Sequence, residues 1–258
     1  MDSRGAYRTI VGFVALPLLL VAGCPLSSDS VDLSERGNLT LVVSRVSESA
    51  VATATAKVVD NNILSLARRK ITLADDQILS VNDVPLTATT LTDLGLDATL
   101  TATIKAVEAP YKYTVSFDNQ GVATTFKVAP PDDFSDVTPA ASTVVSRSGF
   151  DLTWEPADDD ATVSITIAGQ VVSYASDGSA HVGAGSVSLA DLADDGGISI
   201  GSAQLSGFVA GDITVTLTRA KTASQKLGFS AGTIRLEIVR TIPLTLAAST
   251  VQSTTDGN

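Results

Sequence analysis

The sequence is poor in the residues that build metal centres and disulfide frameworks. Its 258 residues include one cysteine, one histidine and one tryptophan. A single cysteine excludes an intrachain disulfide and a zinc site made of several thiolates. A single histidine excludes a metal site built from several imidazoles. The fold must therefore rest on apolar packing, for which a chain of this length is sufficient.

Charged residues are also scarce, and the basic ones most of all. They make up 17% of the chain, against about 25% in an ordinary soluble domain. Lys and Arg number 17 and Asp and Glu number 28, so the formal net charge is −11. Binding along a phosphate backbone needs clustered Lys and Arg. Nucleic acid is therefore not an expected partner.

The first 24 residues have the pattern of a secretory signal. Arg4 and Arg8 precede an apolar run from Thr9 to Leu20. This run is shorter than the about 20 apolar residues that span a bilayer. The letters VAGC at positions 21–24 then resemble the bacterial lipobox, in which a small residue precedes a cysteine that is acylated. The only cysteine of the chain occupies that position.

The lipobox resemblance implies that residues 1–23 are removed and that Cys24, carrying acyl chains such as palmitate, becomes the N-terminus. Cys24 is then a lipidation site and neither a nucleophile nor a metal ligand. Pro25 stands where Asp would favour inner-membrane retention, so the resemblance implies the outer membrane of a diderm bacterium. Residues 24–37 are polar and serine-rich after the cysteine and are expected to form a flexible tether. The alternative is an ordinary secreted protein with a chance cysteine.

From Asn38 onward, apolar residues recur at every second position. The clearest runs are Tyr111–Phe117, Phe150–Trp154, Val163–Ile167, Ile213–Leu217 and Ile234–Ile238. Such alternation predicts half-buried antiparallel strands, and many short strands favour a sandwich or barrel. Turns are expected at residues 118–121, 194–197 and 210–212. Residues 62–69 can form a helical turn. We therefore predict an all-β protein.

The best candidate for a domain boundary is Pro130-Pro131, because two consecutive prolines cannot donate to a β ladder. We expect two antiparallel β-sandwich domains, at 38–130 and 131–247, followed by a disordered tail at 248–258. The stretch from Gly149 to Pro156 (GFDLTWEP) resembles the second strand of a fibronectin type III module, with Trp154 in the core. This resemblance implies immunoglobulin-like sandwiches.

Two motifs that suggest catalysis or cofactor binding are better explained structurally. Residues 228–232 (GFSAG) match the G-x-S-x-G pattern of hydrolases, but no histidine follows Ser230 and the next residues have a strand pattern. We interpret the motif as a glycine-flanked hairpin connection. His181 lies in the glycine-rich stretch 177–185, which we interpret as a solvated loop. No catalytic residue and no organic cofactor is expected.

Acidic pairs are frequent, and the densest group is Asp158, Asp159 and Asp160. Clustered carboxylates on loops suit calcium, so these three residues are the candidate metal ligands, although the EF-hand order is absent. The same carboxylates leave two alternatives open: a calcium-dependent carbohydrate-binding module and a carboxylate-based hydrolase. The favoured hypothesis is a lipid-anchored, non-enzymatic envelope protein with a binding, adhesive or structural role. Its expected partners are the membrane, through the lipid, and envelope proteins or glycans.

Overall fold

The computed structural model describes residues 37–60, 73–74, 76–90 and 97–248. The signal segment, Cys24, the residues of the tether before Gly37, the stretch 62–69 and the tail from residue 249 onward lie outside these ranges. Within them the protein has sixteen strands and one helix of four residues, α1 (Ser202–Leu205). The prediction of an all-β protein is confirmed. In the described part of the chain, no helix has the length and hydropathy needed to cross a membrane.

The strands fall into two groups along the chain. Those before the Pro130-Pro131 linker are β1 (Gly37–Val46), β2 (Val51–Asp60), β3 (Gln77–Val81), β4 (Val84–Pro85), β5 (Thr87–Thr90), β6 (Asp97–Lys105), β7 (Tyr113–Asn119) and β8 (Val122–Val128). Those after it are β9 (Ser135–Thr138), β10 (Val144–Val145), β11 (Gly149–Glu155), β12 (Thr162–Tyr174), β13 (Ala180–Ala193), β14 (Gly197–Gly201), β15 (Phe208–Ser224) and β16 (Ala231–Leu246).

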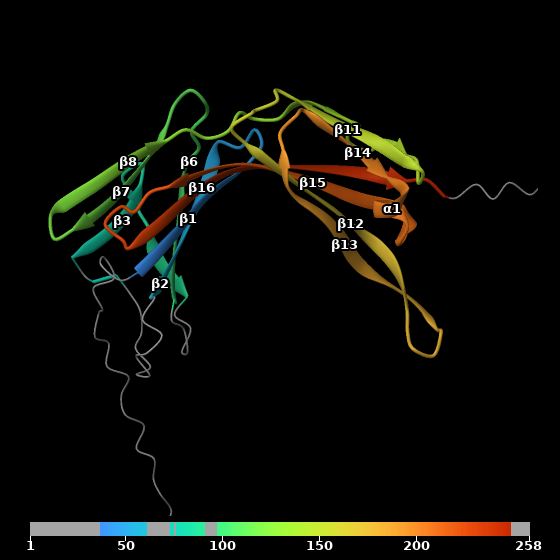
Figure 1. The fold of residues 1–258 in the computed structure, drawn as a ribbon, viewed down its shortest axis with the longest axis horizontal. Coiled ribbons are helices and arrows are strands. Elements are labelled where there is room, and N and C mark those ends of the chain that lie inside the picture. The colour runs from blue at the N-terminus through green and yellow to red at the C-terminus, as the bar shows by residue number, and fades with distance from the viewer. Residues whose placement is uncertain (1–36, 61–72, 75, 91–96, 249–258) are drawn as a thin grey trace, which may run out of the picture.

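One large sheet runs through the whole molecule. Its nine strands include the path β13-β12-β15-β16-β1-β2-β6-β5, with β10 paired to β16 off this path. Two smaller sheets complete the fold, one with the order β4-β3-β7-β8 and one with the order β14-β11-β9. Figure 1 shows the result as an arch with two lobes. We call the part around β1–β8 the first lobe and the part around β9–β14 the second lobe.

Each lobe has its own apolar core between the large sheet and one small sheet. The first core includes Leu41, Val58, Val115 and Phe117, and the second includes Leu152, Trp154, Ile165, Leu217 and Ile242. Both lobes are therefore two-layer sandwiches. The alternation predicted from the sequence is confirmed here, because these strands bury every second side chain.

The hairpin β15–β16 belongs to both cores. Leu227 and Phe229 of the connection and Ile234 and Leu236 of β16 pack in the first core. The second core takes from these two strands Phe208, Ile213, Val215, Leu217, Ile238, Ile242, Leu244 and Leu246. The chain crosses between the lobes at the predicted linker, where Pro130 and Pro131 are buried. Independent folding of residues 38–130 and 131–247 stays a prediction.

Two strand pairings depart from the expected antiparallel pattern. β1 pairs with β16 in parallel, from Asn38 beside Ala231 to Val46 beside Val239. β10 also pairs with β16 in parallel. Parallel neighbours need a long connection, and here most of the chain lies between β1 and β16.

The turn predictions have mixed outcomes. The turn at 118–121 is confirmed as the connection between β7 and β8, with positive φ angles at Gln120 and Gly121. The turn at 194–197 is confirmed between β13 and β14. The prediction of a turn at 210–212 is wrong, because these residues lie inside β15, where Gly211 pairs with Leu246. The prediction of a loop at 177–185 is also wrong from Ala180 onward, because β13 begins there.

Candidate functional site

Two arginines lie in one transverse row of the large sheet, at the waist between the lobes. Ile238 of β16 is paired with Arg45 of β1 on one side and with Arg219 of β15 on the other. Alternate residues of a strand share a face. Both arginines lie on the buried face of their strands. The side chain of Arg45 is 3% exposed and that of Arg219 is 0% exposed. The two guanidinium groups therefore lie inside the protein, where each needs partners.

Arg219 binds three different segments of the second lobe and the linker. Its Nε lies 2.6 Å from Oδ2 of Asp194, whose side chain is fully buried. Its Nη1 donates to the carbonyl of Asp132 over 2.8 Å, and its Nη2 donates to the carbonyl of Pro156. The guanidinium carbon also lies 4.5 Å from the ring centre of Phe134, a cation–π contact. The charge of Arg219 is thus compensated by one carboxylate, backbone dipoles and one ring.

Asp194 connects this ion pair to the only tryptophan. Its Oδ1 accepts a hydrogen bond of 2.6 Å from Nε1 of Trp154, which is 2% exposed. Phe134 packs edge-on against the same indole, with 6.3 Å between ring centroids. The prediction that Trp154 is a core residue is confirmed. Its polar nitrogen has the partner that a buried indole requires.

Arg45 binds the same linker from the first lobe. Its Nη2 lies 2.6 Å from Oδ2 of Asp133, and its Nη1 lies 3.1 Å from Oε1 of Glu108. The backbone N–H of Glu48 donates to the same Asp133 oxygen over 3.0 Å. Burial acts to raise the pKa of Asp133, but these hydrogen bonds and the charge of Arg45 outweigh it and lower the pKa.

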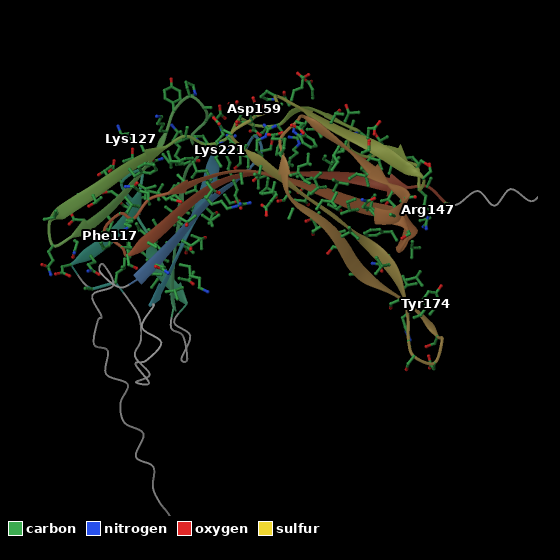
Figure 2. All side chains as sticks on the ribbon, in the orientation of Figure 1. Phe117, Lys127, Arg147, Asp159, Tyr174 and Lys221 are labelled. Atoms are coloured by element: carbon green, nitrogen blue, oxygen red, sulfur yellow. The ribbon has the colours of Figure 1, made fainter. Side chains whose placement is uncertain are left out.

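We call Arg45, Asp133, Asp194 and Arg219 the waist cluster. Its charged groups face one another and the backbone of the linker, so the arrangement holds residues 132–134 across the large sheet. Lys221, the next inward position on β15, extends the pattern with an ion pair of 2.8 Å to Asp158. Figure 2 shows Lys221 beside the junction of the two lobes. The contacts of this centre are ion pairs and hydrogen bonds within the protein.

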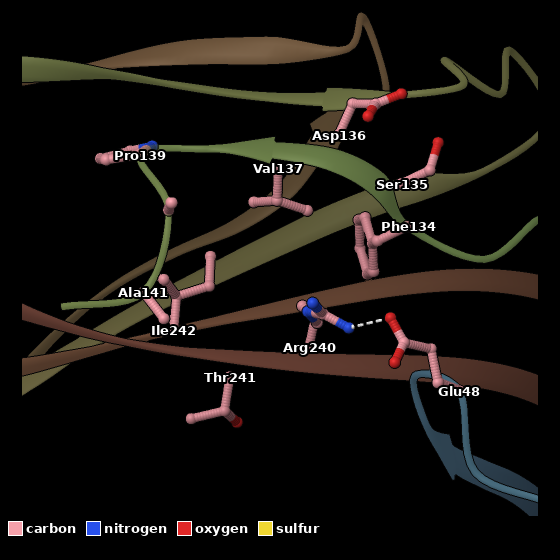
Figure 3. Close-up of a pocket in the computed structure, with 11 residues that line it drawn as sticks. Glu48, Phe134, Ser135, Asp136, Val137, Pro139, Ala141, Arg240, Thr241 and Ile242 are labelled. Atoms are coloured by element: carbon pink, nitrogen blue, oxygen red, sulfur yellow. Dashed lines mark hydrogen bonds and ion pairs between the residues drawn. The ribbon is translucent and has the colours of Figure 1, made fainter. Parts of the chain in front are cut away.

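A cavity of about 340 Å³ lies next to the waist cluster, between β9 and β16. Figure 3 shows Phe134, Val137 and Ile242 on its walls and the ion pair of Glu48 with Arg240 at one end. The Nη1 of Arg240 is 2.7 Å from Oε1 of Glu48. The cation that could attract an anionic ligand is therefore already paired.

The structure does not bring Asp158, Asp159 and Asp160 together around one point. Asp158 is turned inward to Lys221, and its Oδ1 accepts the backbone N–H of Asp160 over 3.2 Å. Asp159 and Asp160 are exposed. Among the residues that the structure describes, no group of three or more Asp, Glu, His or Cys side chains is placed to hold a metal ion. Calcium binding at Asp158–Asp160 stays a prediction.

Ser230 serves a structural contact. It lies in the connection from β15 to β16, as predicted, and a strand follows it. Its hydroxyl donates to the carbonyl of Gly37 over 2.9 Å and lies 3.1 Å from Oδ1 of Asn38. His181 is exposed on β13, with Nε2 at 3.2 Å from the hydroxyl of Ser179. The contacts of Ser230 tie the β15–β16 connection to the start of β1.

The waist cluster was not predicted from the sequence. The available signal was the strand alternation itself, since Arg45 follows Leu39, Leu41 and Val43 at every second position. Arg219 follows Ile213, Val215 and Leu217 in the same way. A charged residue at an inward position indicates a buried ion pair, although it does not identify the partner.

Comparisons with known proteins place this chain in no family. No family model matches it, and no curated protein matches it. Among solved structures, the chain is similar to a structure of three immunoglobulin domains of titin in a mutated variant, with 10% sequence identity and a TM-score of 0.20. The match covers 80% of this chain and 64% of the titin chain, which is less than two thirds of the latter. The architecture described above rests on the strand pairings alone.

Proposed function

We propose that this protein is a non-catalytic structural or binding component of the cell envelope, attached to the membrane by a lipid on Cys24. The observation that carries the proposal is the waist cluster. The charges buried at the centre of the molecule are used to fix one lobe against the other. They are not arranged around a space that a substrate would enter.

The physical cost of such a cluster supports a structural role. A charge in the protein interior is tolerated only with good partners, and apolar residues of the same size often give equal or greater stability. The advantage of the ionic arrangement is then its geometry. Arg219 and Arg45 bind the linker from the two strands that flank β16 on opposite sides. The two lobes are thereby held in one relation, as a spacer or display scaffold requires.

The position of the first strand fits attachment at Cys24. β1 begins at Gly37, so thirteen peptide units separate the cysteine from the folded body. A chain of that length reaches at most about 45 Å when fully extended. The tether would hold the first lobe near the membrane surface. The second lobe, at the other end of the arch in Figure 1, would be carried away from it.

The proposal is tested by membrane fractionation and by mass spectrometry of the mature N-terminus. We expect wild-type protein in the membrane fraction with an acylated Cys24, and Cys24→Ser either released or uncleaved. A second variant that combines Cys24→Ser with Ser27→Cys restores a thiol outside the lipobox and should not restore anchoring. An unmodified mature protein that is cleaved elsewhere and stays soluble would contradict the proposal.

A further inference from the structure

β13 is a long and unprotected edge strand. Its fourteen residues form one end of the nine-stranded sheet, and among the described residues β12 is its only strand partner. Proteins usually guard such edges with charged residues, prolines or bulges. From Ala180 to Ala190, β13 has no Lys, Arg, Asp, Glu or Pro. This stretch can therefore accept a further strand.

The backbone groups that face away from β12 follow from the hairpin geometry. The N–H of Ala175 donates to the carbonyl of Ser179 over 2.9 Å at the β12–β13 turn. In an antiparallel ladder, bonded and non-bonded pairs alternate from there. The even-numbered residues from Ala180 to Ser188 therefore belong to non-bonded pairs. Their outward N–H and C=O groups are those of Ala180, Val182, Ala184, Ser186 and Ser188.

Two contacts agree with this assignment. Val172 is paired with Val182, and its N–H points away from β13 and donates to the carbonyl of Gly207. The hydroxyls of Thr166 and Ser188 lie 3.0 Å apart, as the closer side chains of a non-bonded pair allow. Beyond Leu189 the ladder is interrupted by a register shift, and Asp191 has a φ of 52°. The open edge is thus bounded by the turn at one end and by this irregularity at the other.

We propose that this edge pairs with β13 of a second copy of the chain, antiparallel and about a two-fold axis at Ala184. In that register Ala184 faces Ala184, Val182 faces Ser186 of the second copy, and Ala180 faces Ser188 of the second copy. All outward donors and acceptors between Ala180 and Ser188 are then matched. The large sheets of the two copies become continuous, through an isologous interface of the kind that closes a dimer.

The chemistry of the edge favours a second copy over a foreign peptide. Strand addition takes its specificity from side-chain pockets, and the middle of β13 is occupied by Gly183, Ala184 and Gly185. A Cβ at Gly183 would meet no atom within 4 Å, so this part of the edge is open. The edge therefore offers backbone groups and little else to select a sequence. Its own copy presents the same backbone groups in a matching register.

The distribution of charge on the chain also favours a second copy as the partner. Two chains with a net charge of −11 repel each other over most of their surfaces. The stretch from Ala180 to Ala190 has no carboxylate, so two copies can approach each other along it without placing carboxylates together. Screening by salt should therefore strengthen the dimer. The two large exposed apolar side chains of this hairpin, Tyr174 and Val182, lie on the same face, because Val182 pairs with Val172, two residues before Tyr174.

The inference deepens the proposed structural role by naming its partner, and it is tested without the lipid. Sedimentation of the chain from Pro25 to Asn258, which contains every described residue, should show a monomer–dimer equilibrium that shifts to dimer with added NaCl. Ala184→Pro removes one outward N–H and should yield monomer throughout. A proline is tolerated on an edge strand when its nitrogen faces solvent.

Ala123→Pro is the matched control. Ala123 lies on β8, the edge of the small sheet of the first lobe. Asn119 and Val122 flank the two-residue turn at Gln120-Gly121, so Ala123 belongs to the next, non-bonded pair and its N–H also faces outward. This variant should dimerise as the wild type does. Loss of the dimer in both variants would overturn the assignment to β13.

Two further variants keep the test decisive. If Ala184→Pro melts earlier than wild type by circular dichroism, Ser186→Lys, which places a charge on the edge without changing the backbone, should be monomeric. Ala184→Cys should be cross-linked to its copy by a short bis-maleimide, and Ala123→Cys should not. A monomeric wild type at every concentration, or a dimer that survives Ala184→Pro and Ser186→Lys, would overturn the proposal. Neither result would change the outcome of the Cys24 experiment.

Discussion

Arg45 and Arg219 approach the linker from opposite sides of β16. Arg45 binds the carboxylate of Asp133 over 2.6 Å, and Arg219 binds the carbonyl of Asp132 over 2.8 Å. One arginine comes from the strand that opens the first lobe and the other from the hairpin shared by both lobes. The linker is thus held at two successive residues by two strands that are not neighbours.

Replacing Arg219 with methionine should be strongly destabilising. Arg219→Met leaves the carboxylate of Asp194 buried without its cation, and breaking a buried pair in this way typically costs about 3–5 kcal/mol. Urea denaturation followed by circular dichroism measures the change. Arg235→Met is the matched control, because the pair of Arg235 with Glu237 is partly exposed and should contribute at most about 1 kcal/mol.

The second arm of this test removes both charges. Arg219→Met combined with Asp194→Asn leaves no uncompensated carboxylate and should be more stable than Arg219→Met alone. Equal stability of Arg219→Met and wild type would show that the ion pair does not hold the waist.

Asp133 should make the protein sensitive to acid. Its pKa lies below the ordinary value of 3.8: burial acts to raise it, but hydrogen bonds from the Glu48 and Phe134 N–H groups and the Ser47 hydroxyl, with the charge of Arg45, outweigh burial. A carboxyl group with a lowered pKa contributes stability that is fully present above its unfolded pKa. That stability is lost as the pH falls through the lower, folded value.

The check is the free energy of unfolding from pH 6 downward in wild type and in Asp133→Asn. We expect Asp133→Asn to be less stable near neutral pH and to show a smaller loss between about pH 4 and the folded pKa. Asp159→Asn, at an exposed carboxylate, is the control and should follow the wild-type curve. Parallel curves for wild type and Asp133→Asn would contradict the assignment.

Trp154 reports on the second core. Because the indole is buried, wild-type emission should be blue-shifted and poorly quenched by acrylamide. Trp154→Ala should cost about 3–5 kcal/mol, as for other buried aromatic residues. Trp154→Phe retains most of the packing but leaves Asp194 without its N–H donor, which should cost about 1–3 kcal/mol. Ready quenching of the native protein would refute the buried position.

Ser230 should not react as a hydrolase nucleophile. Its hydroxyl donates to the Gly37 carbonyl, and the residues that follow it form β16 rather than the helix of a nucleophile elbow. We expect no labelling by a fluorophosphonate probe, read by mass spectrometry of the peptide that contains Ser230. Ser230→Ala serves as the background control. Stoichiometric labelling that is lost in this variant would revive the hydrolase alternative.

The fold class could be predicted because burial of one sheet face imposes a period of two. The runs around Ile165 and Val215 show that period, and both are strands with every second side chain buried. At residues 177–185 the prediction was wrong, because it rested on composition and not on this period. Glycine, serine and alanine there indicate a loop, yet β13 forms because its backbone pairs with β12, and no inward side chain is needed at an edge.

The candidate site could be predicted only in part. The inward positions of Arg45 and Arg219 follow from strand alternation, so a buried charge could be expected at each. Their partners could not be expected, because Asp133 is 88 residues from Arg45 and Asp194 is 25 residues from Arg219. The sequence also shows three adjacent carboxylates at Asp158–Asp160, but only the chain path decides that the first of them turns inward to Lys221.

The pairing of β1 with β16 sets the order in which the molecule can be completed. The hydrogen bond of Ser230 with Gly37 spans 193 residues, and Ile234 and Leu236 fill the core that Leu41 and Val43 begin. Synthesis delivers the N-terminus first, and contacts of long sequence separation form slowly. Until residue 239 arrives, β1 has one open edge and its core lacks Ile234 and Leu236. The lobe that begins first therefore cannot be closed until the chain is nearly complete.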